Sequence, residues 1–358
     1  MADHPIEAEL DACRLALNEA LAITAGRFRN PAPLCAAADA AAATVALATR
    51  PLDERPVPIS TGIPSLDLDI RGGVIAGAGE STYVLAARSG IGKTTLAIAA
   101  AMGLAHHGAG VLVISCELSR RAIAARLMAH YCRRAAGVYT NAYSSNDLEG
   151  RGREISGAER ERLEHWAALF ADQRRPDGGP MGPLRYQSHF GATVEDVCAL
   201  VEDAKAALPQ LSVVVLDHFH AMGASPGYGP NTTAELAARA MAIKALAGRC
   251  AVDVFVVAQL NRGAYAGAPD VSHLAGTSEL ERYASAVWLL DRPRPNDGPP
   301  PPAGVLEIHH GKTRHGQLSS DDLSRTTIRL DRAHCFLEAD EARLAFCGSH
   351  LYPGVEVP

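Results

Sequence analysis

The chain has 358 residues, of which 47% are apolar and 21% charged, so we expect a folded protein with one large core and an appendage, or two domains. Its formal net charge of −6 gives no general attraction to nucleic acid. Any DNA binding must therefore come from a local patch, or from a concave surface built by several subunits. The sequence has no apolar run of about 18 residues, the length that a membrane span needs. Its N-terminus is acidic, so we expect a cytoplasmic protein without a signal peptide. The eight cysteines form no Cys-x-x-Cys pair and are predicted to be reduced and structural.

Residues 1–56 are predicted to form a helical arm and a proline-containing linker. Alanine is abundant in this segment, and leucines recur at helical spacing before the sequence Asn30-Pro31 interrupts the pattern. The run PLDERPVP (51–58) is the linker, because each proline removes a backbone donor and disfavours helix in the residue before it. A helix docked on a neighbouring subunit and a helix packed on its own core both remain open for this arm.

Residues 57–340 are predicted to form the core, and 341–358 a C-terminal tail. Short β-branched runs alternate with helical segments through the core, which indicates an α/β fold with a largely parallel sheet covered by helices on both faces. The predicted strands are 83–87, 111–115, 213–216, 254–258 and 286–290, with 305–309 and 326–330 later in the chain. Residues 133–182 are expected to hold helices and surface loops, and the proline-rich stretch 292–304 an exposed loop.

The stretch AARSGIGKTT (86–95) predicts a phosphate-binding loop, since it follows an apolar strand and precedes a helical run. In such a loop, Lys93 places a charge near the phosphates and the hydroxyl of Thr94 is a ligand for Mg²⁺. Alanine replaces the usual first glycine at position 87, which is tolerable if the residue keeps a negative φ. The predicted nucleotide-binding residues are Arg88, Ser89, Gly90, Ile91, Gly92, Lys93, Thr94 and Thr95.

Polar residues follow three further strands at their carboxyl ends. Glu117 comes just after VLVIS, Asp217 directly follows VVVL, and Gln259 ends VFVVAQ. Parallel sheets gather their functional groups at this edge, and an acid after a buried strand is suited to hold the Mg²⁺ shell, as predicted for Asp217. His218 and His220 lack a supporting cysteine or carboxylate pattern, so they are not predicted to bind metal.

Taken together and in order, these motifs resemble those of the DnaB-type replicative helicases and their phage and plasmid relatives, whose ATPase core is RecA-like. The resemblance spans residues 57–338, and the chain is similar in size to the members without a large N-terminal domain. Motifs that carry it are ISTGIPSLDLDIRGG, AARSGIGKTT, ISCELSRRAIAARL, VVVLDHFHAM, VVAQLNR, SHLAGTSELERYASAVWLL and IHHGKTRHG. It implies a RecA-like fold, ATP with Mg²⁺ as cofactors, single-stranded DNA as partner and a homo-oligomer, expected to be a hexamer, with nucleotide sites between subunits.

The resemblance also implies roles for single residues. Glu117 would polarise the attacking water, and Gln259 would sense the γ-phosphate and couple its loss to DNA-contacting loops. Lys312 and Arg314 would reach into the nucleotide site of the neighbouring subunit, where an arginine finger adds a factor of about 10³ to 10⁵ in rate. The alternative for Lys312 and Arg314 is that they are solvated charges at a strand end.

The expected DNA-binding loop departs from the family pattern, which commonly has arginine where this chain has Ala275. Gly276, Thr277 and Ser278 still offer hydroxyl and backbone donors to phosphate oxygens. Arg262 and Arg282 are candidates for the missing charge, each weighed against a plain surface role.

Two functions follow. The first is an Mg²⁺-dependent, ATP-hydrolysing ring helicase that moves 5′ to 3′ on single-stranded DNA, with a possible loader or replication partner. The alternative is a RecA-like, DNA-dependent ATPase that acts as a loader, repair mediator or regulator without unwinding. Ala275 and the net charge of −6 favour the alternative, whereas the complete set of hydrolysis motifs favours ATP turnover in either case.

Overall fold

A computed structural model describes residues 57–75, 79–137, 142–230, 232–261, 263, 267–274, 276, 278–293, 302–314 and 325–340. Contacts divide the chain into Met1–Arg55 and Pro56–Pro358, and every described residue belongs to the second unit. The predicted arm and C-terminal tail lie outside the described residues. Among the helices that the structure describes, none is long and apolar enough to cross a membrane.

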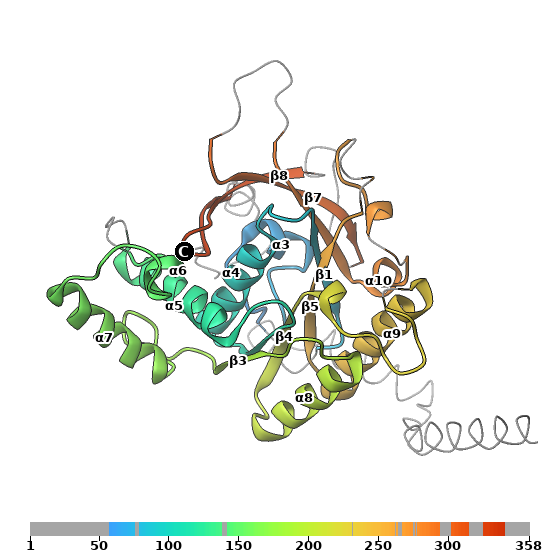
Figure 1. Cartoon of the computed structure of the whole chain (residues 1–358), viewed down its shortest axis with the longest axis horizontal. Coiled ribbons are helices and arrows are strands. Elements are labelled where there is room, and N and C mark those ends of the chain that lie inside the picture. Colours follow the sequence, from blue (N-terminus) through green and yellow to red (C-terminus); the bar gives the residue numbers. More distant parts are fainter. Residues whose placement is uncertain are drawn as a thin grey trace, which may run out of the picture. The chain divides into compact units, whose positions relative to one another are not determined.

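The core is built on one nine-stranded sheet with the strand order β3-β2-β4-β5-β1-β6-β7-β8-β9 (Figure 1). Strands β1 to β6 pair in parallel, and β7 to β9 continue the sheet in antiparallel fashion. The strands are β1 (Thr82–Ala87), β2 (Gly110–Ser115), β3 (Leu184–Ser188), β4 (Leu211–Asp217), β5 (Asp253–Gln259), β6 (Ala286–Asp291), β7 (Val305–Thr313), β8 (Arg325–Asp331) and β9 (Phe336–Asp340). The predicted α/β fold with a largely parallel sheet is thus confirmed, while β3 and β9 were not among the predicted strands.

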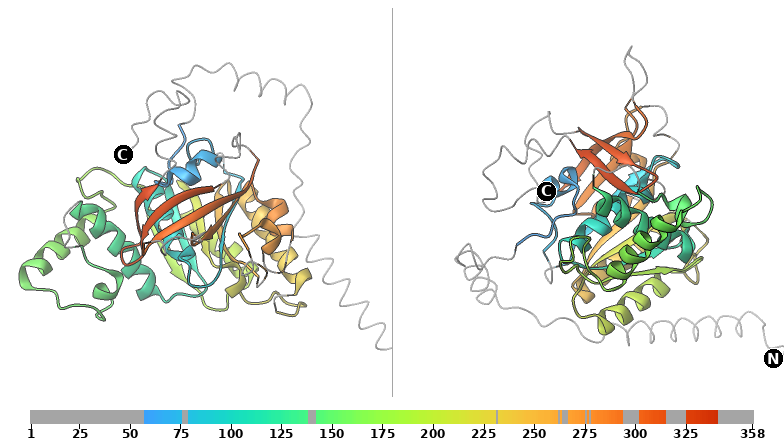
Figure 2. Two further views of the ribbon diagram at one scale, coloured as in Figure 1. Left: turned by 90° about the horizontal axis from the view of Figure 1, so that it is seen from above. Right: turned by 90° about the vertical axis from the view of Figure 1, so that its left-hand side faces the viewer.

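Helices cover both faces of the sheet, because every residue of strands β1, β2 and β4 is buried and successive side chains point to opposite faces. One apolar cluster includes Leu85 of β1 and residues of α4 and α5, and the other includes Val84 and residues of α8 and α9. Figure 2 shows the sheet between its covering helices. The helices are α3 (Pro64–Asp69), α4 (Lys93–His106), α5 (Arg120–Ala136), α6 (Ser145–Leu148), α7 (Gly157–Ala171), α8 (Val194–Ala207), α9 (Thr233–Cys250) and α10 (Ser278–Tyr283), with the short 3₁₀ turns η2 (Phe219–Ala221) and η4 (Val271–His273).

The predicted helices and surface loops of 133–182 are present in its described part. Helix α7 contains no buried residue, and it begins with a capping box between Ser156 and Glu159. Because such a box satisfies backbone donors at the first turn, the helix start is defined locally and needs little tertiary support.

Buried carboxylates join α3 to the antiparallel part of the sheet. Asp69 accepts a hydrogen bond from Trp288 Nε1 at 2.7 Å and pairs with His310 Nδ1 at 2.6 Å. Asp340 of β9 accepts from the Ser65 hydroxyl at 2.5 Å. These long-range contacts fix the segment that leads into the core.

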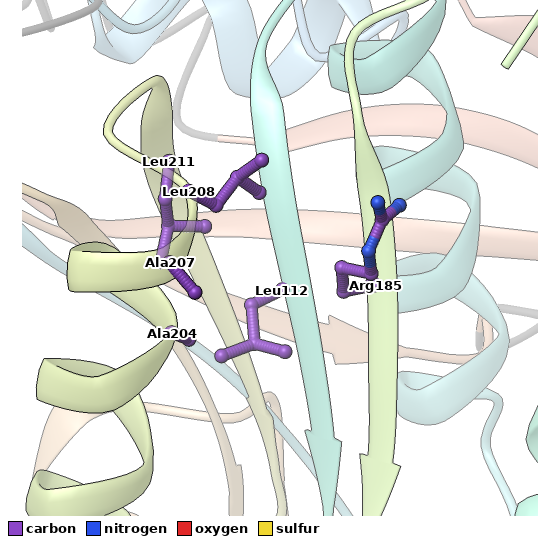
Figure 3. Close-up of a pocket in the computed structure, with 6 residues that line it drawn as sticks. All are labelled: Leu112, Arg185, Ala204, Ala207, Leu208 and Leu211. Carbon is purple, nitrogen blue, oxygen red and sulfur yellow. The ribbon is translucent and has the colours of Figure 1, made fainter.

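A pocket of about 330 Å³ lies between α8 and the β2–β3 edge of the sheet (Figure 3). It is lined by Leu112, Arg185, Ala204, Ala207, Leu208 and Leu211. Since Leu211 is the first residue of β4, this pocket lies toward the amino ends of the strands, away from the edge where the predicted site residues gather.

Candidate active site

Two glycines shape the backbone of the loop between β1 and α4. Gly90 and Gly92 have φ values of 75° and 125°, which side chains other than glycine rarely adopt. Ala87 is not among the described residues with positive φ; it is the last residue of β1 and is fully buried. The alanine therefore replaces a glycine at a position where extended backbone suffices.

Helix α4 begins directly after this loop and presents its N-terminus to it. Gly92 is the N-cap and supplies no side-chain hydrogen bond, so the first N–H groups of the helix have no capping side chain. These donors and the positive end of the helix dipole favour a bound anion. Lys93 is the first helical residue and is 9% exposed, so its charge lies at the same place.

Thr94 and Asp217 come together beside the loop. The Thr94 hydroxyl donates to Asp217 Oδ1 at 3.0 Å, and the Ser115 hydroxyl donates to Oδ2 at 3.4 Å. Ser115 and Asp217 are register partners at the ends of β2 and β4. Burial raises the pKa of Asp217 to about 6, although the hydrogen bond from Thr94 and the charge of Lys93 oppose the shift.

This oxygen pair fits a divalent cation. A hydroxyl and a carboxylate are the donor types that Mg²⁺ prefers, and a cation beside Asp217 would offset the cost of burying its charge. Thr94 and Asp217 are the two residues predicted to hold Mg²⁺, and their metal-binding roles stay predictions.

Glu117 lies just beyond the end of β2, with its side chain 55% exposed and Oε2 at 3.0 Å from His218 Nε2. Its backbone N–H donates to the Ser115 hydroxyl at 3.3 Å. Burial lowers the pKa of His218 to about 4, while the charge of Glu117 opposes the shift. A neutral His218 thus borders the carboxylate at neutral pH.

Gln259 ends β5, directly opposite Ala87 in the parallel register. Its backbone N–H donates to His220 Nδ1 at 3.3 Å, and the His220 backbone N–H donates to His218 Nδ1 at 3.2 Å. The structure therefore brings Lys93, Thr94, Glu117, Asp217 and Gln259 to one edge of the sheet, as predicted from their positions after strands.

Two contacts to the predicted phosphate-binding loop were missed by sequence reasoning. Arg88 forms an ion pair with Asp291, the last residue of β6, whose side chain is 3% exposed. Asp291 follows AVWLL just as Asp217 follows VVVL, so the same pattern could have identified it. Arg332, in the turn after β8, donates to the Gly90 carbonyl at 2.9 Å, and no sequence signal pointed to that contact.

Lys312 and Arg314 lie near the amino ends of the parallel strands, opposite the end where the other predicted site residues gather. In the antiparallel register, Lys312 faces Val287 and Thr313 faces Ala286, the first residue of β6, whereas Asp291 at the far end of β6 pairs with Arg88 of the phosphate loop. A rise of about 3.3 Å per residue separates the two ends of β6 by roughly 16 Å. These two side chains are thus remote from the phosphate loop of their own chain.

Both side chains bind the last carbonyls of α10. Lys312 Nζ donates to the Glu281 carbonyl at 2.7 Å and to the Arg282 carbonyl at 3.3 Å. The Arg314 guanidinium also donates to the Arg282 carbonyl. Since α10 begins at Ser278, this helix connects the predicted DNA loop to the predicted trans-acting residues.

The predicted DNA-binding residues are only partly described, because Arg262, Ala275 and Thr277 lie outside the described residues. Gly276 and Ser278 are both exposed, and Gly276 has a φ of 79°. The base of the loop is closed by the hydrogen bond from Asn261 N–H to the His273 carbonyl at 2.8 Å. Arg282, the other candidate, is 71% exposed and lies 3.4 Å from Glu279 in an ion pair.

Comparisons with known proteins show which family and which relatives the chain is similar to. The family model described as DnaB-like helicase C terminal domain matches residues 58–327. The replicative DNA helicase DnaB of Pasteurella multocida (strain Pm70) is 27% identical over 269 residues, which are 73% of this chain and 52% of that protein. The chain thus spans about half the length of this curated relative.

Solved structures share the fold. One solved ATPase domain superposes with a TM-score of 0.68 at 16% identity, covering 85% of this chain and 99% of that one. A DnaB-like replicative helicase, solved in a study of its interactions with primase, gives a TM-score of 0.65 at 17% identity, covering 90% of this chain and 70% of that one.

Proposed function

The chain belongs to the family of DnaB-like helicase C-terminal domains, and from this premise we propose that it is the ATP-hydrolysing motor of a ring helicase that translocates on single-stranded DNA. The observation that carries the proposal is the meeting of Thr94 and Asp217, 3.0 Å apart, beside the open N-terminus of α4. This is the arrangement that nucleotide phosphates with a divalent cation require. By analogy with the family, we expect movement in the 5′ to 3′ direction and a cytoplasmic location.

We assign phosphate binding to the loop from Arg88 to Thr95. The N–H groups at the start of α4 would bind phosphate oxygens, and Lys93 would approach the β- and γ-phosphates. Thr94 and Asp217 would hold Mg²⁺, which when bound neutralises charge that develops on the transferred phosphoryl group. The Arg88–Asp291 pair and the Arg332 contact to Gly90 would keep the loop in its binding conformation.

Glu117 is the group proposed to orient and deprotonate the attacking water. Its carboxylate is exposed, and it lies on the same edge of the sheet as Asp217 and the phosphate loop. Gln259, at the end of the neighbouring strand β5, would sense the γ-phosphate through its side-chain amide. The segment after Gln259 leads into the proposed DNA loop, so the loss of the γ-phosphate would be transmitted there.

Lys312 and Arg314 are proposed to complete the nucleotide site of an adjacent subunit. Their place at the opposite end of β6 supports this role, because neither can serve the phosphate loop of its own chain without a large rearrangement. Hydrolysis would then need a closed oligomer, which we propose to be a homohexamer.

The second candidate function is a DNA-dependent ATPase that serves as a loader, repair mediator or regulator without unwinding. The presence of Ala275 in the proposed DNA loop and the net charge of −6 favour it, because each subunit would contribute less positive charge to the DNA path.

ATPase and fork-unwinding assays, with and without single-stranded DNA, separate the two candidates. We expect DNA-stimulated ATPase, loss of turnover in Lys93→Ala, and strand displacement from a fork. Arg325→Ala is a matched control, since this arginine is 59% exposed and forms an ion pair with Glu307 on the antiparallel strands. ATPase without strand displacement would refute the helicase and favour the second candidate.

The trans role of Arg314 is tested by mixing variants. Arg314→Ala and Glu117→Gln should each lose turnover by a factor of about 10³ or more when assayed alone. Mixed rings contain interfaces at which an intact Glu117 meets an intact Arg314, so the mixture should recover part of the activity. Full activity of Arg314→Ala alone would exclude the assignment.

A further inference from the structure

The side chain of Glu117 extends from the end of β2 and is 55% exposed, yet its carboxylate has a defined partner. Oε2 lies 3.0 Å from Nε2 of His218, a ring that is 8% exposed overall. Holding an exposed glutamate in one orientation costs rotamer entropy, so a specific contact is needed to keep it there. The buried ring of His218 supplies a contact of fixed position.

A hydrogen bond from the backbone defines the tautomer of His218. Nδ1 accepts the backbone N–H of His220 at 3.2 Å and therefore carries no proton. In the neutral ring the proton is then on Nε2, the nitrogen that lies 3.0 Å from Glu117 Oε2. The backbone thus selects the tautomer whose proton is on the ring nitrogen close to Glu117.

The same connection continues to the strand that carries Gln259. Nδ1 of His220 accepts the backbone N–H of Gln259 at 3.3 Å. The 3.0 Å contact between Glu117 and His218 is therefore continued by two hydrogen bonds, through His220, to the end of β5. These contacts connect the ends of β2 and β5 through the residues that directly follow Asp217, the last residue of β4.

We propose that His218 is a positioning residue for hydrolysis, which fixes the orientation of the Glu117 carboxylate and ties it, through His220, to the strand end that bears Gln259. The proposal rests on the proposed function, since it takes Glu117 as the group that orients water. It assigns a role to the histidine after Asp217 that neither metal binding nor phosphate binding explains.

Substitutions at His218 can distinguish the roles of its two ring nitrogens. His218→Phe keeps a ring but removes both contacts, and we expect kcat for ATP to fall about 10- to 100-fold with KM unchanged, as for a misplaced catalytic group. His218→Gln can place an amide N–H where Nε2 lies and should recover most of the rate. His218→Asn can replace only the acceptor for the His220 N–H, so it should not recover the rate.

A double-mutant cycle tests whether His218 acts through Glu117. In single-turnover measurements, His218→Phe should cause no further loss once Glu117→Ala is present, because the group that it positions is gone. Additive losses would overturn the proposal, as would a His218→Phe variant with the kcat of the wild type. Loss of fluorescent-nucleotide affinity in His218→Phe would also overturn it, by showing a merely structural role.

The tautomer can be measured without any turnover. In protein labelled with ¹⁵N-histidine, the ring signals of His218, assigned by their absence in His218→Phe, should report a proton on Nε2 and should shift in Glu117→Ala. A proton on Nδ1, or a spectrum unchanged by Glu117→Ala, would overturn the His218 assignment alone. A wild-type protein without ATPase would instead overturn the proposed function.

Discussion

Arg239 lies completely buried beneath the segment that follows η2. Its Nη2 donates to Glu235 Oε1 at 2.7 Å and to the carbonyls of Met222 and Gly223 at 3.3 and 3.2 Å, and Nη1 donates to the carbonyl of Phe219. One guanidinium thus satisfies several backbone acceptors and holds the chain that leaves the site after His218. The other oxygen of Glu235, Oε2, is buried without a hydrogen-bond partner among the described residues.

Loss of this arginine should be costly. Arg239→Ala leaves Glu235 as a buried and uncompensated charge, and we expect the free energy of unfolding to fall by about 3–5 kcal/mol. Arg249→Ala on the same helix is the control: its pair with Glu202 is 53% and 50% exposed, and such pairs contribute about 0–1 kcal/mol. Urea unfolding measures both, and equal losses would contradict the distinction between the buried and the exposed pair.

At the scale of an element, α4 is held against the segment before α3 by a close approach of backbones. A Cβ on Gly103 would lie 1.9 Å from the Thr61 carbonyl oxygen, a distance that no relaxation of a side chain can relieve. Helix α4 carries Lys93 and Thr94 at its start, so the packing at Gly103 helps to set where the proposed phosphate-binding end of the helix lies.

Alanine substitution should therefore change the free energy of unfolding in opposite directions at two helical glycines. Gly103→Ala forces the backbones apart and should lower the free energy of unfolding by about 1–3 kcal/mol or more. Gly248→Ala, in α9, meets nothing within 4 Å and should raise it by about 0.4–1 kcal/mol, because alanine restricts the unfolded chain. Midpoints of chemical denaturation would show these opposite changes in stability. A stabilised Gly103→Ala variant would contradict the close approach of the backbones.

At the scale of the whole molecule, a buried carboxylate makes global stability depend on pH. Asp67 accepts hydrogen bonds from the Ser60 hydroxyl at 2.6 Å and the Thr61 hydroxyl at 2.7 Å, but burial outweighs them and raises its pKa to about 7 from the ordinary value of 3.8. Between these values the folded protein holds a proton that the unfolded chain has lost. Stability from this group therefore falls as the pH rises from about 4 to 7, and is constant above that.

The variant Asp67→Asn should remove this contribution. The slope of unfolding free energy against pH between 4 and 7 should become less negative by up to about 1.4 kcal/mol per pH unit. Asp217 and Asp253, whose pKa values burial raises to about 6, act in the same direction and are unchanged in the variant. Exposed Asp172→Asn serves as the control, and an identical slope in Asp67→Asn and wild type would show that Asp67 does not titrate in this range.

Much of the site could be predicted from local sequence. Apolar strands followed by Glu117, Asp217 and Gln259, and a strand followed by Gly-Lys-Thr, are patterns within a few residues, and parallel strands bring such ends to one edge. The strand β3 escaped prediction because its sequence, LRYQS, lacks the apolar run of a central strand and only its first residue is buried. The arm, Arg262 and Thr277 lie outside the described residues and stay predictions.

By itself, the sequence determined the kind of fold, the glycine-containing loop between β1 and α4 and the acids that follow the strands, because hydrophobic periodicity and loop geometry depend on near neighbours. Only the tertiary structure decided that His218 contacts Glu117, that Arg332 reaches Gly90, and that Lys312 lies at the end of β6 remote from its own phosphate loop. Strand order and register set such contacts between distant segments, and they result from the packing of the whole sheet rather than from any local pattern.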